Sequence, residues 1–115
     1  RLGALGKAAP DMMQGFGRLA KAATADGTFS IAQKELIATA IAVVKGCHDC
    51  ILYHVDAAKR NGATEEQLSE VLTVAVEMGG GPALMQGSGS LPGNVKPHKH
   101  NSFRVRSNAL NFNNW

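Results

Sequence analysis

The longest apolar stretch of the chain is "LIATAIAVV", residues 36–44, and charged residues flank it on both sides. A membrane-spanning helix needs about 20 apolar residues, so this stretch predicts a buried helix and not a membrane span. Ser30 is suited to cap the start of a helix over 31–45. Because that helix is apolar on nearly every side after Glu35, we expect it to lie at the centre of the fold.

Two further helices are predicted on the C-terminal side of this segment. The first, over about 47–61, ends at Gly62, which can adopt the left-handed backbone that closes many helices. The second, over about 65–78, opens with a capping box formed by Thr64 and Gln67. No segment alternates apolar and polar residues as a strand does, so the sequence predicts an all-α, compact domain.

The N-terminal part of the chain predicts one more helix, over about 11–25. Pro10 and Asp11 suit its start, although Gly15 and Gly17 weaken its propensity. "DGTFS" then predicts a turn that leads into the central helix. The apolar residues of this first helix recur at spacings of three and four: Met12, Phe16, Leu19 and Ala23.

The C-terminal part differs in character from the rest. "GGGPALM", residues 79–85, breaks the preceding helix, and Pro82 is suited to begin a short fifth helix. From Gln86 the chain is rich in Gly, Ser, Asn and Pro without a sustained period, which is typical of a linker or a disordered tail. The sequence therefore predicts a helical domain over 1–85 and an irregular, basic C-terminal tail over 86–115.

Size and composition are those of a single globular domain of 115 residues, with 44% apolar and 18% charged residues. A domain this small buries only about 65% of its unfolded surface, so self-association would add core. No signal peptide is visible, and because the chain begins with Arg1 we expect a piece of a longer or processed protein. Two cysteines exclude the disulfide-rich secreted class and favour a cytoplasmic protein.

The charge is unevenly distributed along the chain. Residues 1–85 carry eight Lys/Arg and nine Asp/Glu, whereas residues 86–115 carry four Lys/Arg and no acid. Four positive charges without a periodic face do not indicate a nucleic-acid-binding protein. Neither a nucleic acid nor a membrane is therefore expected as a partner.

The segment "GCHDCILYH", residues 46–54, carries the most distinctive chemistry. It holds Cys47 and Cys50 three residues apart, and His54 follows the second cysteine by four. Haem attachment requires C-x-x-C-H, and the residue after the second cysteine is Ile51. A haem anchor is excluded.

A zinc site and a structural crosslink are weaker interpretations of this segment. A structural zinc ion needs four ligands, and the segment offers only three, so His98 or His100 would have to complete the set. A disulfide between cysteines three apart closes a very short loop and removes little entropy from the unfolded chain. Neither metal binding nor stability explains the spacing well.

Redox chemistry accounts for more of the detail. The cysteines are expected at a helix N-terminus, where unpaired amides and the helix dipole favour a thiolate. Lowering a thiol pKa from about 8.5 to about 7 raises the thiolate fraction at neutral pH from roughly 3% to roughly half. Cys47, Cys50 and His54 share one helix face, so the imidazole can act as a base. The second thiol can trap a sulfenic acid formed on the first.

Two polar residues allow both a structural and a functional interpretation. His54 is either a partly buried polar residue beside Tyr53 or the base for the thiols. Glu35, on the most apolar helix, is either a first-turn acid that pairs with Lys34 or with the helix dipole, or a partly buried carboxyl that relays a proton to or from the thiols.

Residues 34–85 resemble the carboxymuconolactone decarboxylase superfamily, and within it the alkylhydroperoxidase D-like branch. The resemblance rests on "KELI" with its Glu35, the C-x-x-C pair twelve residues later, His54, and "NGATEEQ" leading to "GGGPALM". Together these motifs are far more specific than C-x-x-C alone. The resemblance extends loosely over about 10–33.

This resemblance implies a compact all-helical fold of the alkylhydroperoxidase D-like type that assembles into trimers or hexamers. It also implies a thiol-dependent peroxidase or disulfide oxidoreductase activity, with no cofactor and no metal ion. Glu35, Cys47, Cys50 and His54 occupy the positions of the family's proton relay and redox pair. In that scheme Cys50, assisted by His54 and Glu35, attacks a hydroperoxide. Cys47 then closes a disulfide, which an external dithiol partner reduces.

Two departures from the family pattern stand out. Some members carry a histidine just before the second cysteine, where this chain has Asp49, whose charge opposes a thiolate; His48 lies one position earlier. Members normally continue "GGGPALM" into an apolar helix, whereas this chain turns polar at Gln86. We interpret the departure at Gln86 as the shortened end of the domain, followed by sequence foreign to it.

Two other functions remain open at this stage. One is decarboxylation of small lactone acids, the other chemistry of the superfamily, although that branch generally works without a cysteine pair. The other is a non-catalytic redox sensor or assembly module that uses the same disulfide as a switch.

Overall fold

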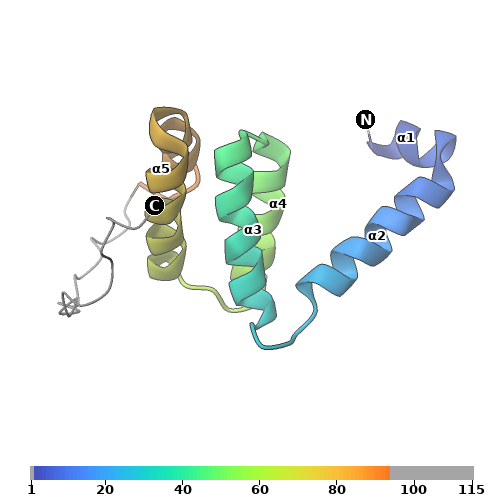
Figure 1. The fold of residues 1–115 in the computed structure, drawn as a ribbon, viewed down its shortest axis with the longest axis horizontal. Helices are drawn as coiled ribbons and strands as arrows, with labels where there is room; N and C mark the ends of the chain where they lie inside the picture. The colour runs from blue at the N-terminus through green and yellow to red at the C-terminus, as the bar shows by residue number, and fades with distance from the viewer. Residues whose placement is uncertain (1, 94–115) are drawn as a thin grey trace, which may run out of the picture.

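The computed structural model describes residues 2–93, and this part of the chain forms five helices and no strand. Figure 1 shows a body of three helices and, apart from it, an arm of two. The arm consists of α1 and α2, and the body of α3, α4 and α5. The all-α prediction is confirmed. The helices are α1 (Leu2–Ala8), α2 (Pro10–Thr24), α3 (Ile31–Lys45), α4 (His48–Arg60) and α5 (Glu65–Ser88).

The central helix of the body is α3, which packs against α4 on one side and α5 on the other. Its predicted bounds and its central position are confirmed. Ser30 caps the helix by accepting a hydrogen bond from the backbone of Gln33, whose side chain in turn accepts from the backbone of Ser30, so a full capping box fixes the start of α3. Apart from Ala57, the buried apolar residues of the described chain form one cluster: Leu36, Ala42, Val43, Ile51, Ala58, Leu68, Leu72, Ala75 and Ala83.

The run of three glycines divides α5 into two segments. Gly80 has φ 67° and ψ −151°, a conformation that is essentially restricted to glycine. The predicted break is confirmed, and the second segment corresponds to the short helix predicted at Pro82. This segment continues through Ser88, beyond the boundary predicted at Gln86, because Ala83 and Gly87 are buried against the body. The tail predicted from sequence otherwise falls largely on residues 94–115, outside the described part.

The arm contributes nothing to the core of its own chain. No residue of α1 or α2 is buried, and Met12, Phe16 and Leu19 on α2 are 48%, 63% and 65% exposed. In Figure 1, α2 approaches the body only at its junction with α3. The sequence predicted α2 to within one residue at each end. It did not predict α1, whose two glycines lower its helix propensity.

Gly79 and Gly81 provide a matched pair that tests the packing of α5 on α3. A Cβ atom on Gly79 would lie 2.6 Å from Cβ of Ala83 and 3.2 Å from Cγ2 of Val44, whereas one on Gly81 would meet nothing within 4 Å. We expect Gly79→Ala to lower the free energy of unfolding by about 1–3 kcal/mol through overpacking. Gly81→Ala should leave it unchanged or raise it by up to about 1 kcal/mol.

Urea denaturation followed by circular dichroism, at one protein concentration for both variants, measures this difference. Equal stabilities of the two variants would show that Gly79 is not packed as closely against Ala83 and Val44 as described.

Candidate functional site

The redox segment begins at the sharp corner between α3 and α4. Gly46 closes α3 in the left-handed conformation, at φ 68°, and its N–H donates to the carbonyl of Val43. The N–H of Cys47 donates to the carbonyl of Ala42, and the carbonyl of Cys47 accepts from the N–H of Ile51. Cys47 therefore makes the last closing hydrogen bond of α3 and occupies the N-cap of α4, which places the C-x-x-C motif at the N-terminus of α4, as predicted.

Cys47 and Cys50 are joined by a disulfide, with their Cα atoms 5.2 Å apart. Both residues are half-buried, so the bond lies at the surface of the body and not within its core. The side chain of Cys47 makes no capping hydrogen bond. The first-turn amides of α4 are thus not used by the sulfur in the oxidised form, and they are available to stabilise an anion there after reduction.

Glu35 and His54 form a hydrogen-bonded pair between α3 and α4. The Nδ1 atom of His54 lies 2.6 Å from Oε2 of Glu35, and the two side chains are 26% and 6% exposed. A carboxylate removed from water is costly unless it is paired, and a distance this short is typical of a charge-assisted hydrogen bond. Glu35 is therefore a buried carboxyl paired with His54 and not a first-turn acid paired with Lys34, and its part in a proton relay stays a prediction.

This pair also determines which nitrogen of the His54 ring can exchange a proton with another group. Because Nδ1 of His54 is engaged by the carboxylate, Nε2 on the far edge of the ring is the atom that can exchange a proton with another group. The ring of Tyr53 lies edge-on to that of His54, with centroids 5.1 Å apart. Sequence reasoning singled out both Glu35 and His54 as partners of the thiols. It did not identify their contact with each other, which depends on how α3 packs against α4.

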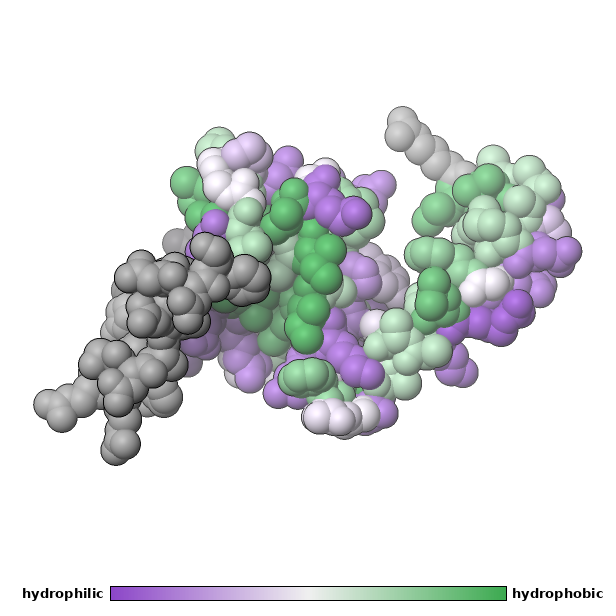
Figure 2. All heavy atoms as spheres, in the orientation of Figure 1, coloured by the Kyte–Doolittle hydropathy of each residue, from purple (hydrophilic) through white to green (hydrophobic). Residues whose placement is uncertain are grey.

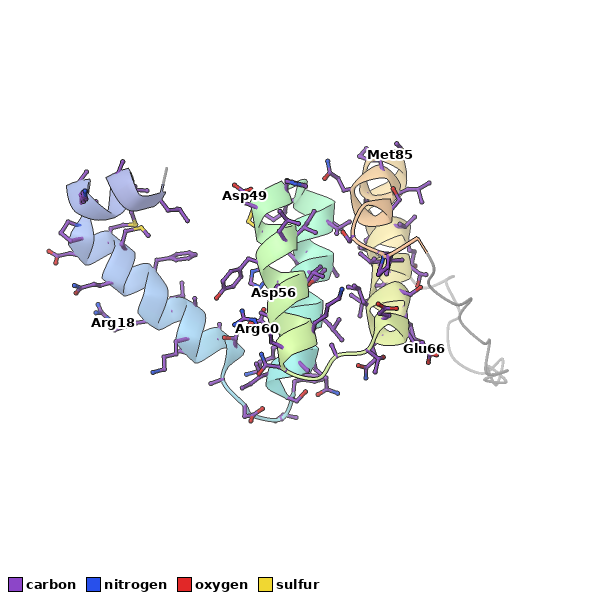
Figure 3. All side chains as sticks on the ribbon, turned by 180° about the vertical axis from the view of Figure 1, so that it is seen from behind. Arg18, Asp49, Asp56, Arg60, Glu66 and Met85 are labelled. Carbon is purple, nitrogen blue, oxygen red and sulfur yellow. A yellow bond between two sulfur atoms is a disulfide. The ribbon has the colours of Figure 1, made fainter. Side chains whose placement is uncertain are left out.

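His48 and Asp49, between the two cysteines, are both exposed. His48 lines a hollow of about 380 Å³ between α4 and the end of α5, and neither cysteine lines that hollow. Figure 3 shows Asp49 at the end of α4, on the side turned toward α2. No hydrogen bond joins His48 or Asp49 to the Glu35–His54 pair among the described residues.

Neither a metal site nor a membrane-spanning helix is found among the described residues. Within residues 2–93 no group of three His, Cys, Asp or Glu side chains is placed to hold a metal ion, and His98 and His100 lie outside this range. In the same range no helix combines the length and apolar character needed to cross a bilayer.

Comparisons with known proteins point to one family. The sequence profile of the Carboxymuconolactone decarboxylase family matches residues 10–89. An uncharacterized protein of Cupriavidus necator is 54% identical over 91 residues, which cover 79% of this chain and 80% of that protein. Uncharacterized protein 4 of the cox locus of Paracoccus denitrificans is 40% identical over 90 residues, covering 78% and 81% of the two chains.

Two solved structures agree with these sequence matches. The apo form of a carboxymuconolactone decarboxylase family protein from Legionella pneumophila is 46% identical, with a TM-score of 0.74, over 77% of this chain and 80% of that one. A member from Thermotoga maritima, described as a candidate participant in the antioxidative response, is 32% identical with a TM-score of 0.61, over 69% and 84% of the two chains. The profile match, the sequence identities and the shared fold show that the chain belongs to the carboxymuconolactone decarboxylase family.

Proposed function

We propose that this protein is a thiol-dependent peroxidase or disulfide oxidoreductase of the alkylhydroperoxidase D-like kind, which reduces hydroperoxides through Cys47 and Cys50. One observation carries the proposal. Two half-buried cysteines lie at the N-terminus of α4, and one turn after Cys50 the same helix carries an imidazole whose Nδ1 is bound by a buried carboxylate. The Thermotoga maritima relative, a candidate participant in the antioxidative response, is consistent with it.

The first half-reaction consumes the hydroperoxide. In the reduced protein, Nε2 of His54 accepts the proton of the Cys50 thiol. The thiolate attacks one peroxide oxygen, the O–O bond breaks, and the alkoxide leaves as an alcohol after taking a proton from His54. Cys50 is thereby oxidised to a sulfenic acid.

The second half-reaction closes the disulfide. The Cys47 thiolate attacks the sulfur of the sulfenic acid, an S–S bond forms, and hydroxide leaves as water after protonation. One hydroperoxide thus takes two electrons from the two thiols. An external dithiol then reduces the disulfide by thiol exchange and is itself oxidised. Such a cycle requires a reducing compartment, so we propose the cytoplasm as its location.

Glu35 supports this chemistry through His54. Its carboxylate fixes the ring with Nδ1–H toward Oε2, so that Nε2 is the free base, and its negative charge stabilises the imidazolium that forms when the thiol gives up its proton. Because Glu35 is buried, this attraction is screened less than it would be at the surface. Glu35 is therefore a positioning residue in the proposed cycle.

The place of Cys47 suits the resolving role. It occupies the N-cap position of α4, where the first-turn amides stabilise a thiolate without help from a base. Cys50 lies within the helix, one turn before His54, and has the imidazole as its proton acceptor. The two thiols are thus activated by different groups, which allows one to attack the peroxide and the other to attack the sulfenic acid.

Serine variants of the two cysteines separate these roles. We expect Cys50→Ser to reduce the rate of organic hydroperoxide consumption at least about a thousandfold, because the nucleophile is lost. Cys47→Ser should consume one equivalent per chain and then stop, with a sulfenic acid on Cys50 that dimedone traps and mass spectrometry locates. Retained turnover in Cys50→Ser would assign the nucleophile to another residue.

Activity on a small lactone acid that survives alkylation of both thiols would favour the decarboxylase assignment instead.

Replacement of Glu35 by Gln tests the relay. Gln has nearly the same size and still accepts a hydrogen bond from Nδ1–H, but it cannot stabilise the imidazolium by charge. We expect Glu35→Gln to slow disulfide formation by hydroperoxide about ten- to hundredfold and to change the shape of the pH–rate profile, with helix content preserved. The control is Glu66→Gln, an exposed carboxylate at the opposite end of the body from Asp49 (Figure 3), which should leave the rate unchanged. An unaltered profile in Glu35→Gln would contradict the relay.

A further inference from the structure

The side chains that meet a hydroperoxide are those beside the sulfurs and not those of the hollows on the body. The apolar groove between α3 and α5 is lined by residues of those two helices only, and no cysteine is among them. Figure 2 shows the hydrophobic side chains of α3 on the face turned to the viewer. The hollow beside His48 also lacks a lining cysteine. A substrate of the redox pair therefore contacts the surface of α4 around Cys50.

Tyr53 is the aromatic side chain of this surface. It follows Cys50 by three residues on α4, and side chains at that spacing are neighbours on a helix, with Cβ atoms about 5–6 Å apart. Its ring lies edge-on to that of His54, with centroids 5.1 Å apart and planes at 88°. Tyr53 thus borders both the proposed nucleophile and the proposed base.

Most of the Tyr53 side chain is open to solvent, since it is 63% exposed. An aromatic ring buries a large apolar area when a ligand covers it, and it packs on another ring in offset or edge-on geometries. A hydroperoxide with an apolar group can therefore cover this ring while its O–O bond meets the sulfur of Cys50. Hydrogen peroxide has no apolar group to place there.

Asp49 borders the same surface with a negative charge. It directly precedes Cys50, lies four residues before Tyr53 and is exposed. Figure 3 shows it at the end of α4, on the side turned toward α2. The cations nearest to it in the sequence, Lys45 and His48, line the apolar groove and the hollow described above. An anionic substrate on the Tyr53 ring would therefore be repelled by a like charge, less strongly at high salt.

We infer that the redox site selects uncharged, apolar hydroperoxides. Tyr53 contacts the apolar group of the substrate, and Asp49 disfavours substrates that carry a negative charge. Both are specificity-determining residues for the step in which the Cys50 thiolate attacks the peroxide. The inference rests on the proposed function and leaves the electron and proton transfers of that step unchanged.

A ratio of rate constants tests the contact with Tyr53. Reduced full-length protein is mixed with cumene hydroperoxide or with hydrogen peroxide, and disulfide formation is followed by acid quench and thiol alkylation. We expect Tyr53→Ala to lower the ratio of the two second-order rate constants about three- to tenfold, through slower reaction with cumene hydroperoxide. Tyr53→Phe retains the ring and should retain the wild-type ratio. The control Leu52→Ala removes an exposed apolar side chain that lines the hollow beside His48, and it should also retain the ratio.

A matched pair of substrates tests the charge of Asp49. Cumene hydroperoxide and its para-carboxylate derivative react at the same O–O bond and differ in charge. We expect the wild-type protein to prefer the uncharged compound at low salt, and Asp49→Asn to reduce this preference about two- to fivefold. The exposed control Glu66→Gln should leave it unchanged. Because both substrates meet the same thiolate, their ratio is independent of how much thiolate each variant holds.

The outcomes separate this specificity from the proposed function. A wild-type ratio in Tyr53→Ala would overturn the contact with the substrate. An equal loss of rate with both peroxides would also overturn it, because such a loss indicates an effect through His54. An unchanged charge preference in Asp49→Asn would overturn the part of Asp49. Absence of disulfide formation with every hydroperoxide would instead refute the proposed function, and the specificity with it. Circular dichroism verifies that the variants, all at exposed positions, retain their helices.

Discussion

Glu35 is the fifth residue of α3, the most apolar helix of the described chain, and it is almost completely removed from solvent. A group of this kind is tolerated only where something else satisfies it, and in this structure the partner is Nδ1 of His54, 2.6 Å away. The bond ties α3 to α4 across the body. It also fixes the orientation of the imidazole one turn after Cys50, so that the same contact satisfies a buried carboxylate and positions the base of the proposed chemistry.

The rest of the body places the sulfurs relative to this pair. The left-handed Gly46 closes α3, and Cys47, which follows it, is the N-cap of α4, so the chain turns and the C-x-x-C motif opens α4. His54 then follows one turn after Cys50 on the same helix, while Glu35 comes from the central helix beside it. The short corner thus places the two cysteines at the start of α4, and the packing of α3 against α4 pairs His54 with a buried carboxylate.

Much of this arrangement was predictable because its signals are local. Ser30, Gly62 and the Thr64 capping box fix helix ends through contacts within a few residues, and the predicted bounds of α3 and α4 agree with the structure. The cysteine pair and His54 were identified from their spacing on one helix face. The Glu35–His54 bond joins residues nineteen apart, and it required knowledge of how two helices pack. The helix α1 was not predicted for a similar reason, because a short helix with two glycines is not specified by its own sequence.

The most direct test of this account is the protonation state of the His54 ring in the two redox forms. Nitrogen-15 NMR of histidine-labelled protein at neutral pH, with His54 assigned by substitution, reports the proton on each ring nitrogen. With the disulfide closed, the account predicts a neutral ring that carries its proton on Nδ1, toward Glu35. After reduction of Cys47 and Cys50 it predicts a second proton on Nε2, taken from a thiol. An identical His54 spectrum in the oxidised and reduced proteins would contradict the coupling on which the proposed chemistry depends.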